Sequence, residues 1–125
     1  MKLQQISENI VYLPKDDTTD RPILAAVSGS KSTLLIDAGA SPAHVKLFQN
    51  ELKQHHIHPG DYVAITHWHW DHSFGMAALN LPIIAHAETR NHLMKMMNCK
   101  NSTWGQQIQG LILYGTSGNL QMKQK

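Results

Sequence analysis

A short segment, residues 67–72, concentrates side chains that bind metal ions. It reads His67-x-His69-x-Asp71-His72, so four of six residues carry an imidazole or a carboxylate. Side chains two residues apart in an extended chain point the same way, so His67 and His69 are able to reach one ion. Asp71 and His72 follow as the chain turns, and they point to a neighbouring place. The spacing therefore predicts a metal site.

The alternative interpretation is a solvated, histidine-rich turn, since the chain holds nine histidines in 125 residues. Trp68 and Trp70, at the intervening positions, argue against a simple solvated loop. Two roles stay open for these tryptophans: they line a substrate cleft, or they pack beneath the motif.

The other histidines are assigned to different places. His86 follows a predicted strand and is a candidate extra ligand, with a structural hydrogen bond as the alternative. We expect His44 to be exposed in the first turn of a helix. We expect the rest to be solvated, either near a helix end or on a helix surface: His55, His56, His58 and His92.

The elements that must position the motif alternate between strand and helix. A helix is predicted from Pro42, with Ser41 as its cap, because Val45, Phe48 and Leu52 form one apolar stripe. Shorter helices are predicted over 74–80 and 88–97. Strands are predicted over 9–13, 23–27, 32–37, 62–65, 82–85 and 111–114. This order predicts an α/β layered domain with the motif directly after a buried strand, where ligand sites form.

Composition excludes several classes of protein. The length of 125 residues, 42% of them hydrophobic, suits one domain. Charged residues make up 16% of the chain, which has a formal net charge of +2 and one cysteine. We expect no membrane span, no secretory signal and no nucleic-acid partner, because long apolar runs and basic runs among aromatics are missing. Cys99 alone forms no intramolecular disulfide, and we expect a cytoplasmic location.

The motif and its flanks resemble the metallo-β-lactamase superfamily. The family signature is a His-x-His-x-Asp-His run at a strand end. Similar family segments surround it: Thr-Leu-Leu-Ile-Asp-Ala-Gly over 33–39, Asp-Tyr-Val-Ala-Ile-Thr over 61–66, Asp-His-Ser-Phe-Gly over 71–75 and Leu-Pro-Ile-Ile-Ala-His over 81–86. We therefore expect residues 1–97 to form the N-terminal half of the αββα sandwich, a mixed sheet flanked by helices. Residues 98–125 are expected to be an atypical polar tail.

The resemblance implies a hydrolase in which metal-activated water attacks an ester, thioester, amide or phosphodiester. His67 and His69 would bind the first metal, and Asp71 and His72 the second. Asp71 would also be catalytic, orienting the water and moving a proton, while Asp37 would order the motif loop. The full family site holds two ions, usually zinc and sometimes iron or manganese.

The chain also departs from the family. The complete domain is about twice as long, and its second half normally supplies the remaining ligands. We therefore expect one zinc ion at partial occupancy, or none, and a chain shortened by truncation or a frame shift. A small molecule is the expected substrate. A second copy, or a missing second half, is the expected partner for the exposed sheet face. The alternative function is a non-catalytic metal-binding remnant or interaction module.

Overall fold

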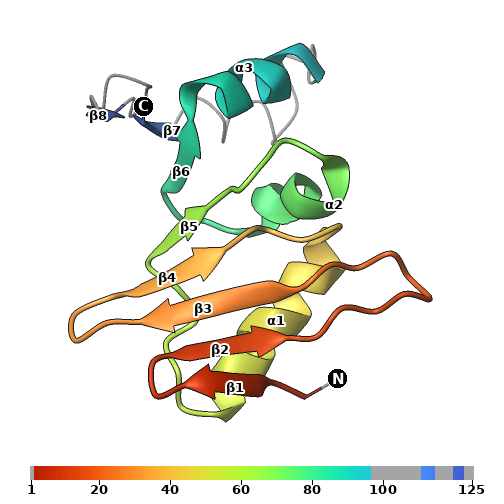
Figure 1. The fold of residues 1–125 in the computed structure, drawn as a ribbon, viewed down its shortest axis with the longest axis vertical. Helices are drawn as coiled ribbons and strands as arrows, with labels where there is room; N and C mark the ends of the chain where they lie inside the picture. The colour runs from red at the N-terminus through yellow and green to blue at the C-terminus, as the bar shows by residue number, and fades with distance from the viewer. Residues whose placement is uncertain (1, 97–110, 115–119, 123–125) are drawn as a thin grey trace.

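One mixed sheet organises the chain in the computed structural model, which describes residues 2–96, 111–114 and 120–122 (Figure 1). Eight strands follow one another across the sheet in sequence order. They are β1 (Gln4–Ser7), β2 (Ile10–Leu13), β3 (Leu24–Ser28), β4 (Thr33–Ile36), β5 (Tyr62–Ala64), β6 (Ile83–His86), β7 (Leu111–Tyr114) and β8 (Leu120–Met122). The helices are α1 (Pro42–Gln54), α2 (Trp70–Ser73), the 3₁₀ helix η1 (Phe74–Ala78) and α3 (Ala87–Met96).

The sheet changes from antiparallel to parallel pairing at β4. Strands β1 to β4 pair antiparallel, β4 to β7 pair parallel, and β8 returns antiparallel. Parallel neighbours need a long crossover, which α1 supplies between β4 and β5, and α2 with η1 between β5 and β6. The carboxyl ends of β4, β5 and β6 therefore meet at one edge. The predicted α/β class with a mixed sheet and helices is confirmed.

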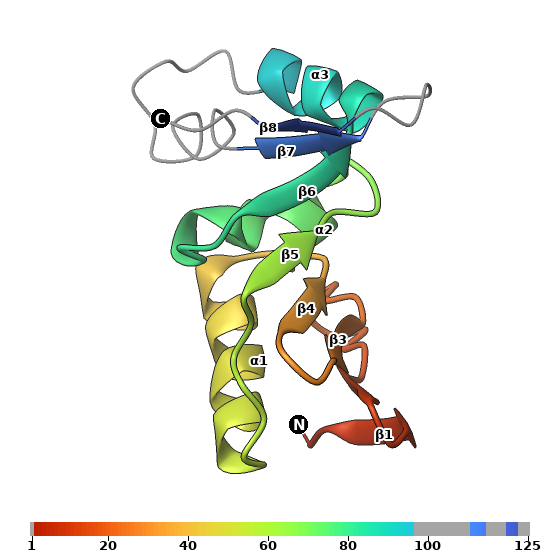
Figure 2. The ribbon, with the colours of Figure 1, turned by 90° about the vertical axis from the view of Figure 1, so that its left-hand side faces the viewer.

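Helix α1 begins where the sequence predicts. The Ser41 hydroxyl accepts a hydrogen bond from the His44 backbone N–H at 3.2 Å, and Pro42 occupies the first turn. Figure 2 shows α1 lying along one face of the sheet. Phe48 and Leu52 are fully buried there. The expectation that His44 is exposed is wrong, because His44 lies on the same stripe, four residues before Phe48, and is 1% exposed.

The two faces of the sheet differ sharply in exposure. One face packs against the helices and carries the core residues of the strands: Leu13, Leu24, Ala26, Leu35, Val63, Ile83 and Ala85. The alternate positions point to the other face, and all stay partly or fully exposed: Ile10, Tyr12, Ala25, Val27, Leu34, Ile36, Tyr62, Ala64 and Ile84. We call this second set the open face.

Some elements were not predicted. Strand β1 has four exposed residues and lies at the sheet edge, so no hydrophobic alternation marks it. The predicted helix over 74–80 begins earlier, at Trp70, and continues as η1 to Ala78. The predicted tail lies largely outside the described residues, apart from β7 and β8, and Cys99 lies outside them as well. No described helix is long and apolar enough to cross a membrane.

Candidate metal-binding site

The motif lies in the loop that leaves β5 and in the first turn of α2. His69 immediately precedes α2, and the His72 N–H donates to the His69 carbonyl oxygen at 3.0 Å. The buried Ser73 hydroxyl is 3.2 Å from the Trp68 carbonyl oxygen and 3.0 Å from the His69 carbonyl oxygen. These local bonds turn the chain, so that Asp71 and His72 return toward β4.

Asp37 holds this loop from the end of β4. Asp37 is 5% exposed, and its carboxylate accepts hydrogen bonds from the Thr66 N–H at 2.7 Å and the Thr66 hydroxyl at 2.9 Å. It also accepts one from His72 Nδ1 at 2.8 Å. Asp37 has a φ of 67°, a left-handed conformation that Asp adopts more readily than most residues. The turn thus directs the carboxylate at the motif.

Two histidines of the motif have a defined tautomer. The Thr66 hydroxyl donates to Asp37, so His67 Nδ1–H donates to the Thr66 oxygen at 2.9 Å. His72 Nδ1–H donates to Asp37. Each Nε2 lone pair is then directed away from these partners, as in a metal-ligating histidine. Thr66 was not identified from the sequence, since its role depends on a carboxylate 29 residues away.

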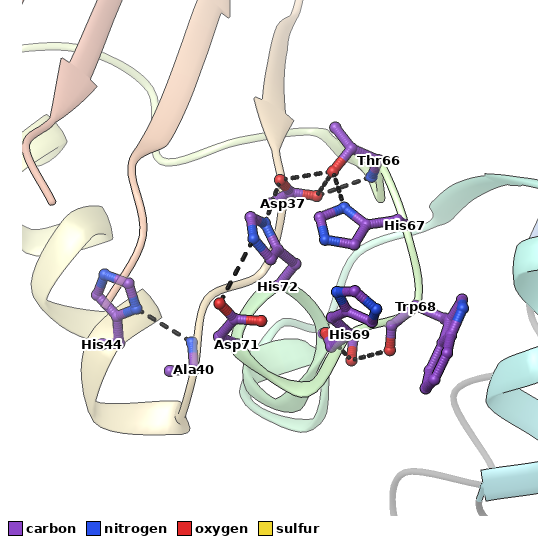
Figure 3. Close-up of polar contacts among 10 residues, drawn as sticks. Asp37, Ala40, His44, Thr66, His67, Trp68, His69, Asp71 and His72 are labelled. Carbon is purple, nitrogen blue, oxygen red and sulfur yellow. Dashed lines mark hydrogen bonds and ion pairs between the residues drawn. The ribbon is translucent and has the colours of Figure 1, made fainter. Parts of the chain in front are cut away.

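The ring groups gather at one place (Figure 3). The centre of the His67 ring lies 4.7 Å from that of His69 and 4.1 Å from that of His72. His72 Nε2 lies 3.6 Å from Asp71 Oδ2. Because His72 donates through Nδ1, a neutral ring would present a lone pair to that carboxylate. A metal ion held near both atoms would relieve this pairing of two acceptors.

The imidazole nitrogens and the carboxylate of the motif are types of ligand that bind metal ions. Among the described residues, however, no three His, Cys, Asp or Glu side chains converge closely enough to hold an ion. The described residues by themselves therefore do not complete a metal site.

A cleft borders the motif. It measures about 340 Å³ and is lined by Trp70, Asp71 and the loop between β2 and β3. That loop contributes the cations Lys15 and Arg21 beside three acids, Asp16, Asp17 and Asp20. A hydrogen bond from the Thr18 hydroxyl lowers the pKa of Asp16.

The two tryptophans have different surroundings. Trp68 packs against the core and stacks on the exposed His92, with ring centres 5.1 Å apart and planes 14° apart. Trp70 is 45% exposed and lines the cleft. Trp68 therefore is a packing residue and Trp70 lines a cleft, while the binding of a substrate in that cleft stays a prediction.

The remaining histidines lie elsewhere. His86 Nδ1 accepts a hydrogen bond from the Glu88 N–H at 3.1 Å, at the start of α3, which is a structural contact. His55, His56 and His58 are exposed and line a separate cleft of about 570 Å³ with residues of β1 and of the β3–β4 hairpin. That cleft lies at the end of the sheet opposite the motif.

Solved structures with a similar fold are metallo-β-lactamases. BJP-1 of Bradyrhizobium japonicum has a TM-score of 0.61 at 18% identity, over 74% of this chain and 36% of its own. The Cronobacter sakazakii metallo-β-lactamase has a TM-score of 0.63 at 17% identity, over 76% of this chain and 38% of its own. FIM-1 of Pseudomonas aeruginosa, in its mono-zinc form, has a TM-score of 0.61 at 18% identity, over 78% of this chain and 47% of its own. Such identities show the fold alone, and this chain spans less than half of each structure.

The comparison with curated proteins gave no match. A family model described as Anti-Pycsar protein Apyc1 matches residues 22–124, which is most of the chain. The resemblance to metallo-β-lactamases is therefore confirmed for the fold, and the matching family carries a different name. The chain has a metallo-β-lactamase-like fold and belongs to the Anti-Pycsar protein Apyc1 family.

Proposed function

We propose that the chain contributes to a metal-dependent hydrolase site, with zinc as the ion. The observation that carries this proposal is the gathering of three imidazoles, with the ring centres of His69 and His72 at 4.7 Å and 4.1 Å from that of His67. Nitrogen and carboxylate oxygen are zinc ligands, and iron and manganese are the alternatives. The similar fold of the mono-zinc FIM-1 structure supports the same ion.

Each motif residue has a role in this proposal. His67, His69, Asp71 and His72 hold the metal, with further donors from outside the described residues. Asp37 and Thr66 fix the rings of His67 and His72 through their Nδ1 atoms. A bound metal lowers the pKa of water and so supplies a nucleophile near neutral pH. Asp71, at the edge of the cleft, takes up and returns a proton through its carboxylate.

The substrate that we propose is a small molecule with a phosphodiester. Esters, thioesters and amides are hydrolysed by the same chemistry, and the Apyc1 family match favours the phosphodiester among them.

A second function has an observation in its favour. Because no three donors converge within the described residues, a non-catalytic metal-binding or interaction module is the alternative. In that case the chain acts by binding a partner through the open face of the sheet, and not through the motif.

Metal content and turnover test the proposal. Purified chain should contain zinc by elemental analysis and should hydrolyse bis(4-nitrophenyl) phosphate faster than a generic ester or lactam. His69→Ala should abolish turnover and bound zinc, because it removes a proposed metal ligand. The variant should still fold, since His69 is exposed and its loss leaves the core intact. His55→Ala, an exposed histidine far from the motif, is the matched control and should change neither. A folded chain without turnover, with or without bound zinc, would support the alternative.

A further inference from the structure

One buried histidine outside the motif, His44, contacts the turn that carries Asp37. We call residues 37–40, which join β4 to α1, the β4–α1 turn. His44 Nδ1 accepts a hydrogen bond from the Ala40 N–H at 3.1 Å. The ring lies against Gly39, where a Cβ would come within 2.7 Å of Nδ1. The His44 ring therefore packs directly beneath this turn.

The opposite side of the same turn is bonded to the motif. The Ala38 N–H donates to the His72 carbonyl oxygen at 2.9 Å, and the Gly75 N–H donates to the Gly39 carbonyl oxygen at 3.1 Å. Figure 3 shows His44 and the motif on opposite sides of the ribbon that joins β4 to α1. A shift of the turn would therefore displace the backbone of the motif and the Asp37 carboxylate together.

Histidine is an unfavourable residue for this position. His44 is 1% exposed, and its Nε2 has no hydrogen-bond partner within the described part of the chain. Burial lowers its pKa to about 4, and the Arg21 guanidinium acts in the same direction. An aliphatic side chain would fill the volume without leaving a buried nitrogen unpaired. The feature that a histidine adds here is the acceptor at Nδ1, which binds Ala40.

We propose that His44 is a positioning residue for the motif. By accepting from the Ala40 N–H, it holds the β4–α1 turn against residues 72–75 and so sets the orientation of the Asp37 carboxylate and the His72 ring. It acts through the turn and does not contact the substrate. The proposal rests on the proposed function in treating the motif as the metal site, but the hydrogen bonds it invokes join protein atoms alone.

Three substitutions separate this role from helix capping. His44 is the third residue of α1, where a glutamine reaches back to the N–H of the cap residue. His44→Gln therefore keeps a helix cap and leaves the Ala40 N–H without its acceptor. His44→Asn places an amide oxygen where Nδ1 lies now. His44→Leu removes the acceptor, and if this variant fails to fold, the glutamine and asparagine pair decides.

Amide hydrogen exchange by NMR tests the proposal on metal-free chain. The amides of Ala38 and Gly75 should exchange at least about tenfold faster in His44→Gln and His44→Leu than in the wild type. In His44→Asn they should exchange at nearly the wild-type rate. The Nδ1–H signal of His72 should persist in the wild type and in His44→Asn alone. Unchanged protection in the glutamine variant, or no rescue by asparagine, overturns the proposal.

Zinc affinity, measured with a competing chelator, gives the second readout. We expect His44→Gln to bind zinc about tenfold more weakly and His44→Asn to recover that loss, as for residues that orient metal ligands. Equal affinities for all variants would contradict a positioning role. If the wild type binds no zinc, the proposed function fails, while the exchange result still decides the role of His44.

Discussion

At the residue scale, the motif depends on one hydrogen-bonded chain of side chains. His67 donates to Thr66, Thr66 donates to Asp37, and His72 donates to the same carboxylate. The motif was predicted from residue types and spacing, and Asp37 from the resemblance to the metallo-β-lactamase superfamily. Thr66 was not, because a threonine before a histidine has no special meaning until β4 brings a carboxylate beside it.

The buried imidazole of His44 predicts a pH dependence of stability. The folded pKa is lowered from 6.5 to about 4, mainly by burial and further by Arg21 and His72, while Asp16 opposes the shift. Below pH 6.5 the unfolded chain therefore binds a proton that the folded chain rejects. The free energy of unfolding should fall as the pH decreases from 6.5 to 4, with His44 contributing at most about 3 kcal/mol.

Urea titrations at several pH values, followed by circular dichroism, measure this loss. His44→Asn has no titrating group at this position, so its stability should decline less over the same range. The difference between the two curves isolates His44 from the other histidines and the carboxylates. Parallel curves would show that His44 titrates alike in the folded and unfolded chain.

At the element scale, the β4–α1 turn and the start of η1 approach each other too closely for side chains. Gly39 has a φ of 79°, and its missing Cβ leaves room for the His44 ring. A Cβ at Gly75 would overlap the Ala38 carbonyl oxygen. The sequence predicted the start of α1 from Ser41 and Pro42. It did not predict this contact, which joins two crossovers that are distant in the chain.

Gly75→Ala should therefore disturb the motif. Since the clashing atom belongs to the backbone, the turn must move, and we expect a loss of about 2 kcal/mol or more in the free energy of unfolding. Gly29→Ala is the matched control in the β3–β4 hairpin, where a Cβ would lie 3.1 Å from the Ser32 carbonyl oxygen. Urea denaturation should show the larger loss for Gly75→Ala, and equal losses would contradict the close contact.

At the scale of the whole molecule, the sheet has one packed face and one open face. Leu35 is fully buried against the helices, whereas its neighbour Leu34 lies on the open face and is partly exposed. The expectation that a second copy or a missing half covers this face stays a prediction. The molar mass of the chain in solution tests the first of these partners.

The two faces should respond differently to loss of side-chain volume. Leu35→Ala leaves a cavity in the core and should lower the free energy of unfolding by about 2–5 kcal/mol. Leu34→Ala removes atoms that are already partly in water, so we expect a clearly smaller loss. Thermal or urea unfolding of both variants measures the difference. Equal losses would mean that the open face is covered in solution.

The sequence by itself determined the local features of this protein. Short apolar and β-branched runs marked most of the strands, and helical spacing marked α1. The motif identified its own ligand candidates, because all these signals depend on neighbours along the chain. The tertiary structure decided which side chains act on the motif. Thr66, Gly75 and His44 acquire their roles only where parallel strands bring two crossovers to one edge of the sheet. No residue type or spacing along the chain encodes such contacts between distant segments.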